Sequence, residues 1–247
     1  MGVPAPRGLD VRASGADAAR GYQQACALAD GGAEALLSFG LAGGLDPRLG
    51  PGAVVVGAEV LECRGPIPEP GEGGLREKVG TLFSVGRHAA KAESALPPLS
   101  ADACFAADAR LIALLVEAGG QGAAIGTLVG VDRIVRTRME KSALFARTRG
   151  LAVDMESQGV ARAAAERGLP FGVIRVVFDP SNRELPAALA RAVRPDGSTT
   201  LAPILSALLV NPFELGAYVS MALDSAVALK RLRRVGRRLG AALLGGL

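Results

Sequence analysis

The chain has 247 residues, of which 49% are hydrophobic, so it is long enough to bury one sizeable core of the α/β kind. Its 33 glycines, 4% aromatics and lack of tryptophan favour helices packed tightly on a sheet over an all-β sandwich. The formal net charge is +4, but much of the excess lies at the C-terminus rather than along a binding face, which argues against a nucleic-acid partner.

Strands and helices are expected to alternate along most of the chain. Apolar, β-branched runs between turn residues indicate strands, and apolar residues that recur at intervals of three and four indicate helices. The expected strands cover 35–40, 53–62, 81–85, 121–128, 151–153 and 170–177. The expected helices cover 15–30, 103–118, 139–148 and 155–168. This alternation predicts an α/β fold with a central mixed sheet flanked by helices.

The chain becomes apolar and helical after Pro195, so we expect a domain over 1–195 followed by a helical tail over 196–247. The last helix has an apolar face formed by Ala228, Leu232, Val235, Leu239 and Leu243. Its intervening surface is basic and carries Lys230, Arg231, Arg233, Arg234, Arg237 and Arg238. Such a helix either packs on the domain or lies on a membrane surface.

Cysteine and histidine are too sparse for a metal site or a disulfide framework. Cys26, Cys63 and Cys104 are widely spaced without a CxxC pair, and His88 is the only histidine, which favours a surface position for it. The first 20 residues hold no apolar run of signal-peptide length, and no stretch reaches the roughly 18 apolar residues of a spanning helix. We therefore expect a cytoplasmic protein in a reducing compartment.

Three short motifs are ambiguous when each is taken alone. The stretch SFGLAGGL at 38–45 is typical of many strand-to-turn transitions. The tetrapeptide DMES at 154–157 lies between a short strand and a helix, where an acidic residue commonly caps free amides. Asp179 stands before Pro180 at a strand end, which is typical of a turn. Each motif by itself favours a structural role.

Taken in order, three segments resemble the family of purine nucleoside phosphorylases and methylthioadenosine/adenosylhomocysteine nucleosidases. They are SFGLAGGLDPRLGPGAVVV at 38–56, AVDMESQGVARAAAERGLPF at 152–171 and IRVVFDP at 174–180. FDPSNRELP at 178–186 and AVRPDG at 192–197 further resemble the hopanoid-associated phosphorylase branch. The resemblance covers roughly residues 10–230 and implies a three-layer nucleoside phosphorylase-like fold.

The resemblance implies a role for each site residue. Asp179 would be the acid that protonates the leaving base, since adenine leaves poorly as an anion. Glu156 would accept hydrogen bonds from the ribose hydroxyls, with Met155 beneath the sugar. Arg175, four residues before Asp179 on the same strand face, would orient or tune that acid. The other expected site residues are Phe178, Ile134 and Val135 around the base, and Gly40, Gly43 and Gly44 beside the ribose and phosphate.

The sequence departs from the family pattern on the side of the attacking group. Leu41 replaces a small hydroxyl residue, and Ser38 stands where one branch of phosphorylases has an arginine. The choice between phosphate and water therefore stays open; we expect no cofactor and treat inorganic phosphate as a candidate co-substrate. Relatives begin with a strand and a glycine loop that prepare the nucleophile, whereas this chain begins MGVPAPRGLDVRAS, so we expect that first strand to be missing. Our hypothesis is a start assigned too far downstream; an engineered truncation or a degenerate copy would give the same sequence.

The resemblance implies an enzyme that releases adenine from adenosylhopane and leaves ribosyl- or phosphoribosyl-hopane. A basic amphipathic tail would suit such a lipid substrate by peripheral contact with the inner membrane surface. The family also implies a homo-oligomer. One alternative is a methylthioadenosine/adenosylhomocysteine nucleosidase or a purine nucleoside phosphorylase that acts on small soluble nucleosides. Another is a non-catalytic protein that binds nucleosides or a lipid surface.

Overall fold

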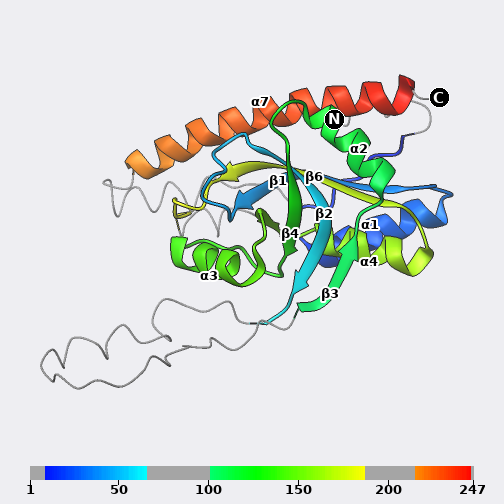
Figure 1. Ribbon diagram of the computed structural model, residues 1–247, viewed down its shortest axis with the longest axis horizontal. Coiled ribbons are helices and arrows are strands. Elements are labelled where there is room, and N and C mark those ends of the chain that lie inside the picture. The colour runs from blue at the N-terminus through cyan, green and yellow to red at the C-terminus, as the bar shows by residue number, and fades with distance from the viewer. Residues whose placement is uncertain (1–8, 66–100, 187–214, 246–247) are drawn as a thin grey trace, which may run out of the picture.

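A computed structural model describes residues 9–65, 101–186 and 215–245 of the chain (Figure 1). The strand expected at 81–85, His88 and the first part of the expected tail, up to residue 214, lie outside these ranges. The described residues form one layered α/β structure, which holds the residues expected for the site.

Six strands of the described residues form one mixed sheet in the order β3-β2-β4-β5-β1-β6. They are β1 (Leu36–Gly44), β2 (Val54–Cys63), β3 (Ala101–Ala106), β4 (Ala124–Gly130), β5 (Ala152–Asp154) and β6 (Phe171–Asp179). The pairs β1–β6, β2–β4 and β4–β5 are parallel, whereas β1–β5, β2–β3 and β2–β6 are antiparallel. The β2–β6 pairing closes five strands into a ring and leaves β3 outside it.

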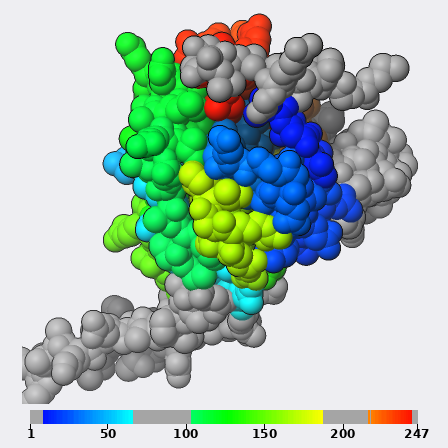
Figure 2. Space-filling model, turned by 90° about the vertical axis from the view of Figure 1, so that its right-hand side faces the viewer, coloured from blue at the N-terminus to red at the C-terminus, as the bar shows by residue number. Residues whose placement is uncertain are grey.

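Helices cover the sheet on both faces. The described helices are α1 (Ala18–Asp30), α2 (Ala109–Gly119), α3 (Arg138–Thr148), α4 (Ser157–Arg167) and α7 (Leu215–Gly245). The long α7 and α2 lie on one face, and α1 and α4 lie together on the other (Figure 1). Figure 2 shows α1 and α4 side by side, with the end of α7 at the opposite edge of the molecule. This three-layer arrangement confirms the predicted fold class.

Strand β6 shows how the sequence pattern produces the layers. Its side chains alternate between two apolar clusters: Val173 and Val177 pack with the helices α1 and α4, while Ile174 and Val176 pack with α2 and α7. Because both faces are covered, the strand is an almost continuous apolar run rather than an alternating one. Its buried Arg175 is the exception within that run.

Most of the expected elements are present, but the helix expected over 103–118 is wrong in its first part. Residues there form β3, which pairs with the edge of β2, and α2 starts only after Asp108, whose side chain caps it. Pairing with an existing strand outweighs the weak local helix propensity of this alanine-containing segment. The strand expected at 35–40 is also longer, because β1 continues through Gly44.

The C-terminal helix α7 packs onto the domain through its apolar face. Ala228, Val235 and Leu239 are buried, and they share a cluster with Val54 of β2 and Ile174 of β6. The apolar face identified from the sequence is therefore covered by the protein's own sheet. Among the helices described, none has the length and apolar character needed to cross a membrane.

Candidate active site

The ends of β5 and β6 lie on either side of β1, and both carry carboxylates. Gly43 of β1 pairs with Val153 of β5 and with Asp179 of β6. Because neighbouring strands lie about 4.8 Å apart, the two flanking positions are about 10 Å from each other. Glu156 follows three residues after Val153, so β1 brings the segment that carries Glu156 close to Asp179.

Asp154 builds the corner between β5 and α4. Its Oδ1 accepts hydrogen bonds from the amides of Glu156 at 2.8 Å and Ser157 at 2.7 Å, and its Oδ2 accepts one from the Ser157 hydroxyl at 2.5 Å. These bonds satisfy amides at the start of α4 that have no partner within the helix. Asp154 thereby holds the backbone that presents Glu156.

Arg175 lies fully buried beneath this corner. Its Nε donates to Asp154 Oδ2 at 3.0 Å, and its Nη2 donates to Ser38 Oγ at 2.7 Å and Ser157 Oγ at 2.8 Å. Burial opposes the ionisation of Asp154, but the charge of Arg175 and the hydrogen bonds from Ser157 outweigh it, so the pKa of Asp154 lies below its ordinary value. Arg175 and Asp154 therefore form an ion pair that is shielded from solvent.

Glu156 lies at the same corner but is partly accessible to solvent, with 20% of its side chain exposed. Its Oε2 lies 3.5 Å from Nη2 of Arg175. Burial raises the pKa of Glu156 to about 7, although the charge of Arg175 works against this, and nearby Asp154 raises it further. The ionised form can accept hydrogen bonds from a hydroxyl-bearing ligand that enters from the open side.

Asp179 occupies the corner at the end of β6, where it meets a lysine from α3. Nζ of Lys141 donates to Asp179 Oδ2 at 2.6 Å, and both side chains are almost completely buried. Burial raises the pKa of Asp179 to about 6, even though the charge and the hydrogen bond of Lys141 lower it. An aspartic acid with this pKa is protonated in about a tenth of the molecules at pH 7, and in more at lower pH, and can donate that proton.

Lys141 also fixes the chain that follows Asp179. Its Nζ donates to the carbonyl oxygens of Pro180 at 3.0 Å and Arg183 at 2.9 Å. Nη1 of Arg183 in turn lies 3.0 Å from Oδ2 of Asp224 on α7. One buried ammonium group therefore holds the acid and the loop after it, and the loop is joined to the C-terminal helix.

The role expected for Arg175 needs correction. The sequence suggested that it tunes Asp179, but its hydrogen bonds go to the β5–α4 corner, and Lys141 is the cation bonded to Asp179. Even spacing does place the two strand residues on the same face, yet four residues of strand span about 13 Å, which is too far for contact. Arg175 instead lies beside Glu156 and donates a hydrogen bond to Asp154, and its charge acts to lower the pKa of both carboxyl groups.

The glycines of β1 lie against buried side chains and backbone of β5 and β6, although a Cβ at Gly40 would make only ordinary van der Waals contact. A Cβ at Gly40 would lie 3.5 Å from Nη1 of Arg175, and one at Gly43 would lie 3.3 Å from Val153 and 3.8 Å from the Asp179 carboxylate. Gly44 is similarly close to the backbone of Pro180. All three were expected in a loop beside ribose and phosphate, whereas they belong to the strand and line the two corners.

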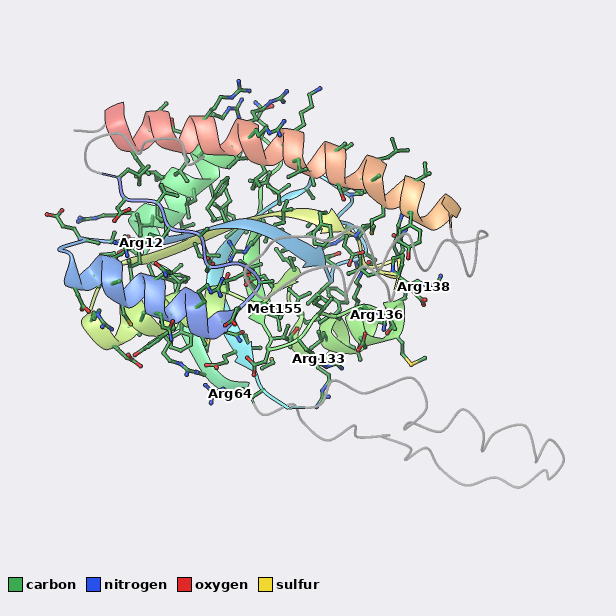
Figure 3. All side chains as sticks on the ribbon, turned by 180° about the vertical axis from the view of Figure 1, so that it is seen from behind. Arg12, Arg64, Arg133, Arg136, Arg138 and Met155 are labelled. Carbon is green, nitrogen blue, oxygen red and sulfur yellow. The ribbon has the colours of Figure 1, made fainter. Side chains whose placement is uncertain are left out.

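The expected base-pocket residues fall into two groups. Val135 is buried in one apolar cluster, against which Met155 also packs; Figure 3 shows Met155 near the middle of the molecule. Ile134 is half-buried in the segment between β4 and α3. Phe178, in contrast, packs with the cluster beneath α7, on the face of β6 opposite to Asp179. The structure therefore does not bring Phe178 to the acid.

Sequence reasoning missed Lys141 and the part that Ser38 plays. Lys141 is three residues before the buried Leu144, so both belong to the inward face of α3, where an unpaired lysine would be costly. That position is a signal for a buried carboxylate partner. Ser38 was noted only as a replacement for arginine, but its hydroxyl accepts a hydrogen bond from the buried Arg175.

A hollow of about 570 Å³ lies beside the site, between α1, α4 and the end of β2. Glu62 forms part of its wall and is paired with Arg162 of α4. Gln158, two residues after Glu156, also lines it and donates to Asp132 at 2.8 Å. Its lining does not include Glu156 or Asp179, so we place the candidate chemistry at the two corners and not in this hollow.

Comparison with known proteins agrees with this architecture. Residues 15–210 match the Phosphorylase superfamily. The S-adenosylhomocysteine nucleosidase of Streptococcus pyogenes has a TM-score of 0.58 at 17% identity, covering 95% of this chain and 77% of its own. The 5'-methylthioadenosine/S-adenosylhomocysteine nucleosidase of Neisseria meningitidis gives 0.57 at 20%, covering 95% and 79%. Futalosine hydrolase of Helicobacter pylori gives 0.57 at 15%, covering 95% and 78%. No curated protein sequence matches the chain.

The layered sheet, with carboxylates at the ends of β5 and β6, has a nucleoside phosphorylase-like fold. Since the family match covers most of its length, the chain belongs to the Phosphorylase superfamily. Its chemistry is accordingly the cleavage of the glycosidic bond of nucleosides.

Proposed function

We propose that the protein releases adenine from adenosylhopane, an adenosyl lipid, and leaves ribosyl- or phosphoribosyl-hopane. The observation that carries the proposal is Asp179, a buried carboxyl group at a strand end with its pKa raised to about 6. A carboxylic acid with a raised pKa is protonated in part of the molecules near neutral pH and can then act as a general acid. The partly open carboxylate of Glu156 lies across the end of β1 from it.

In the proposed reaction Asp179 donates its proton to the purine ring as the bond between C1' and the base nitrogen breaks. The bond electrons leave with the base, which departs as neutral adenine, and the ribose becomes an oxocarbenium-like cation. Water, which gives up a proton to solvent, or phosphate then bonds to C1' on the other side, and Asp179 regains a proton from solvent. Glu156 accepts hydrogen bonds from the ribose hydroxyls, and Met155 packs beneath the sugar.

Lys141 and Arg175 act as positioning residues in this scheme. Lys141 holds the Asp179 carboxyl and the loop that follows it, so the acid keeps one orientation. Arg175 holds Asp154 and lies near Glu156, and its charge favours the ionised form of Glu156 that accepts hydrogen bonds. Neither residue needs to touch the substrate for these roles.

The choice of an adenine nucleoside is supported by the names of two of the similar structures, which are adenosylhomocysteine and methylthioadenosine nucleosidases. The choice of a hopanoid lipid is supported by the segments FDPSNRELP at 178–186 and AVRPDG at 192–197, which resemble the hopanoid-associated branch. The second candidate function is a nucleosidase for methylthioadenosine or adenosylhomocysteine, which the same structural similarity favours.

The proposal is tested by incubating the protein with adenosylhopane in detergent micelles and measuring adenine release with and without inorganic phosphate. We expect release from adenosylhopane to exceed release from methylthioadenosine, and to be lost in Asp179→Asn. Dependence on phosphate would identify a phosphorylase, and independence a hydrolase. Faster release from methylthioadenosine would favour the second candidate, and no release from either by folded protein would overturn both.

A further inference from the structure

The outer face of α7 is a continuous surface stripe with two distinct halves. The stripe consists of residues spaced three or four apart, which share one side of a helix: Val219, Leu223, Val227, Lys230, Arg234 and Arg237. It lies opposite to the face through Ala228 and Val235 that is buried against the sheet. Apart from Val227, whose side chain lies beside Gly52 in the turn before β2, the stripe is separate from the packing that attaches α7 to the domain.

The first half of the stripe is apolar although it faces solvent. The exposed fractions of Val219, Leu223 and Val227 are 51%, 64% and 53%. Single exposed apolar residues are common on protein surfaces, but three in a row at intervals of four make a connected strip. Such a strip indicates a surface that is covered by an apolar partner.

The second half of the stripe is cationic. Lys230, Arg234 and Arg237 are exposed, and Arg233 is exposed beside them. Figure 3 shows side chains with nitrogen tips that point away from the domain along this part of α7. The stripe thus combines an apolar strip with a cluster of four cations.

No acidic residue neutralises this surface from within the helix. Asp224 is the single acidic residue of α7, and it lies on the inner side, 15% exposed and paired with Arg183. Among the described residues, no carboxylate forms an ion pair with any of the four cations, so they present positive charge to whatever covers the stripe. A second copy of the same face would bring like charges together, which disfavours a symmetric dimer through it.

We propose that the outer face of α7 docks on the surface of an anionic lipid bilayer. Val219, Leu223 and Val227 enter the boundary between headgroups and acyl chains, and the four cations lie on the lipid phosphates. Each cation near an anionic bilayer strengthens binding about fivefold, so four of them together with the apolar strip are enough for stable peripheral binding. The helix lies in the plane of the bilayer and does not cross it.

This docking surface is directly connected to the candidate site. Arg183, which follows Asp179 in the chain, pairs with Asp224 on the inner side of the same part of α7. A bilayer on the outer side would therefore lie about one helix diameter, roughly 10 Å, from the loop that follows the acid. The docking inference rests on α7 alone and does not require the proposed substrate.

Leu223→Trp gives a direct test, because the chain has no tryptophan and the introduced one is the sole reporter. With phosphatidylglycerol vesicles we expect its emission to shift to shorter wavelength and to be quenched by lipids brominated in the acyl chains. Met139→Trp is the matched control, since Met139 is 52% exposed on α3 and should show neither change. An unchanged emission from Leu223→Trp, or an equal change in the control, would overturn docking through this face.

A second test uses matched pairs of exposed arginines in vesicle sedimentation. Arg233→Gln with Arg237→Gln should weaken binding to phosphatidylglycerol vesicles about 25-fold, following about fivefold for each cation. Arg12→Gln with Arg138→Gln removes the same charge elsewhere and should change binding less than about twofold. Equal losses in the two pairs, or no binding by the unchanged protein, would overturn the proposal. Stronger binding to an oligonucleotide than to vesicles would assign the face to nucleic acid instead.

Discussion

The corner at the end of β5 and the corner at the end of β6 each join a buried carboxylate to a buried cation, yet they move its pKa in opposite directions. The pKa of Asp154 is lowered, whereas that of Asp179 is raised to about 6. Burial opposes ionisation in both, so the difference lies in what compensates it. Asp154 receives Arg175 and hydrogen bonds from Ser157, while Lys141 divides its three donors between Asp179 and two backbone carbonyls.

The comparison separates Asp154, which has a structural role, from Glu156 and Asp179, which can change their protonation state near neutral pH. Asp154 stays ionised and holds the backbone, whereas Glu156 and Asp179 have pKa values close to neutral pH, at about 7 and about 6. Neighbouring carboxyl groups with different environments are typical of sites that need one group as an acid and another as an acceptor. The following predictions test this division.

The largest expected effect is on catalysis by Asp179→Asn. An asparagine keeps the size of the side chain but cannot donate a proton to the base, so the rate of adenine release should fall about 10²- to 10⁴-fold. Circular dichroism should show an intact fold. Asp30→Asn, at an exposed carboxylate on α1, is the control and should keep full activity. A variant of Asp179 with near-normal turnover would remove the acid role from this residue.

Lys141→Met should cost about 3 to 5 kcal/mol in free energy of unfolding, measured by urea denaturation, because it leaves the Asp179 carboxylate buried without its cation. The double variant Lys141→Met with Asp179→Asn should recover most of this loss, since neither charge is then buried alone. If the double variant were as unstable as the single one, Lys141 would act through packing and not through its charge.

Glu156→Gln should stabilise the fold at alkaline pH. The folded-state pKa of about 7 lies above the ordinary 4.5, so the protein loses stability as pH rises through this interval and Glu156 gives up its proton. The variant avoids that loss, and at pH 8 its free energy of unfolding should be higher by about 2 to 3 kcal/mol. The two proteins should converge below pH 4.5. A difference that persisted there would show that ionisation is not its cause.

The smallest effect concerns the pH dependence of adenine release. Asp179 must be protonated, which favours pH below about 6, and Glu156 must be ionised, which favours pH above about 7. The rate is proportional to the protonated fraction of Asp179 multiplied by the ionised fraction of Glu156. Its pH profile is therefore bell-shaped, with a maximum between the two pKa values. In Glu156→Gln the acid limb should disappear from the residual activity while the alkaline limb remains. A profile that rises steadily up to pH 9 would contradict the assignment.

The fold was largely predictable because its signals are local. Most strands and helices follow from apolar periodicity and from caps such as Asp108. The motifs also singled out Glu156 and Asp179, whose pKa values burial raises in the structure. The failures came where distant segments meet. Pairing with β2 turned 103–106 into strand, and packing beneath α7 took Phe178 away from the acid.

The sequence by itself determined the α/β layers, the family resemblance and the basic amphipathic character of the last helix. Tertiary structure alone decided which charges became partners: Lys141 reaches Asp179 across 38 positions of the chain, and Arg175 reaches Ser38 across 137. It also decided that α7 presents its apolar stripe at Ala228 and Val235 to the sheet and a different stripe to solvent. Periodicity records how a segment is patterned along its own axis, but contacts between segments depend on how the strands pair and where each helix packs.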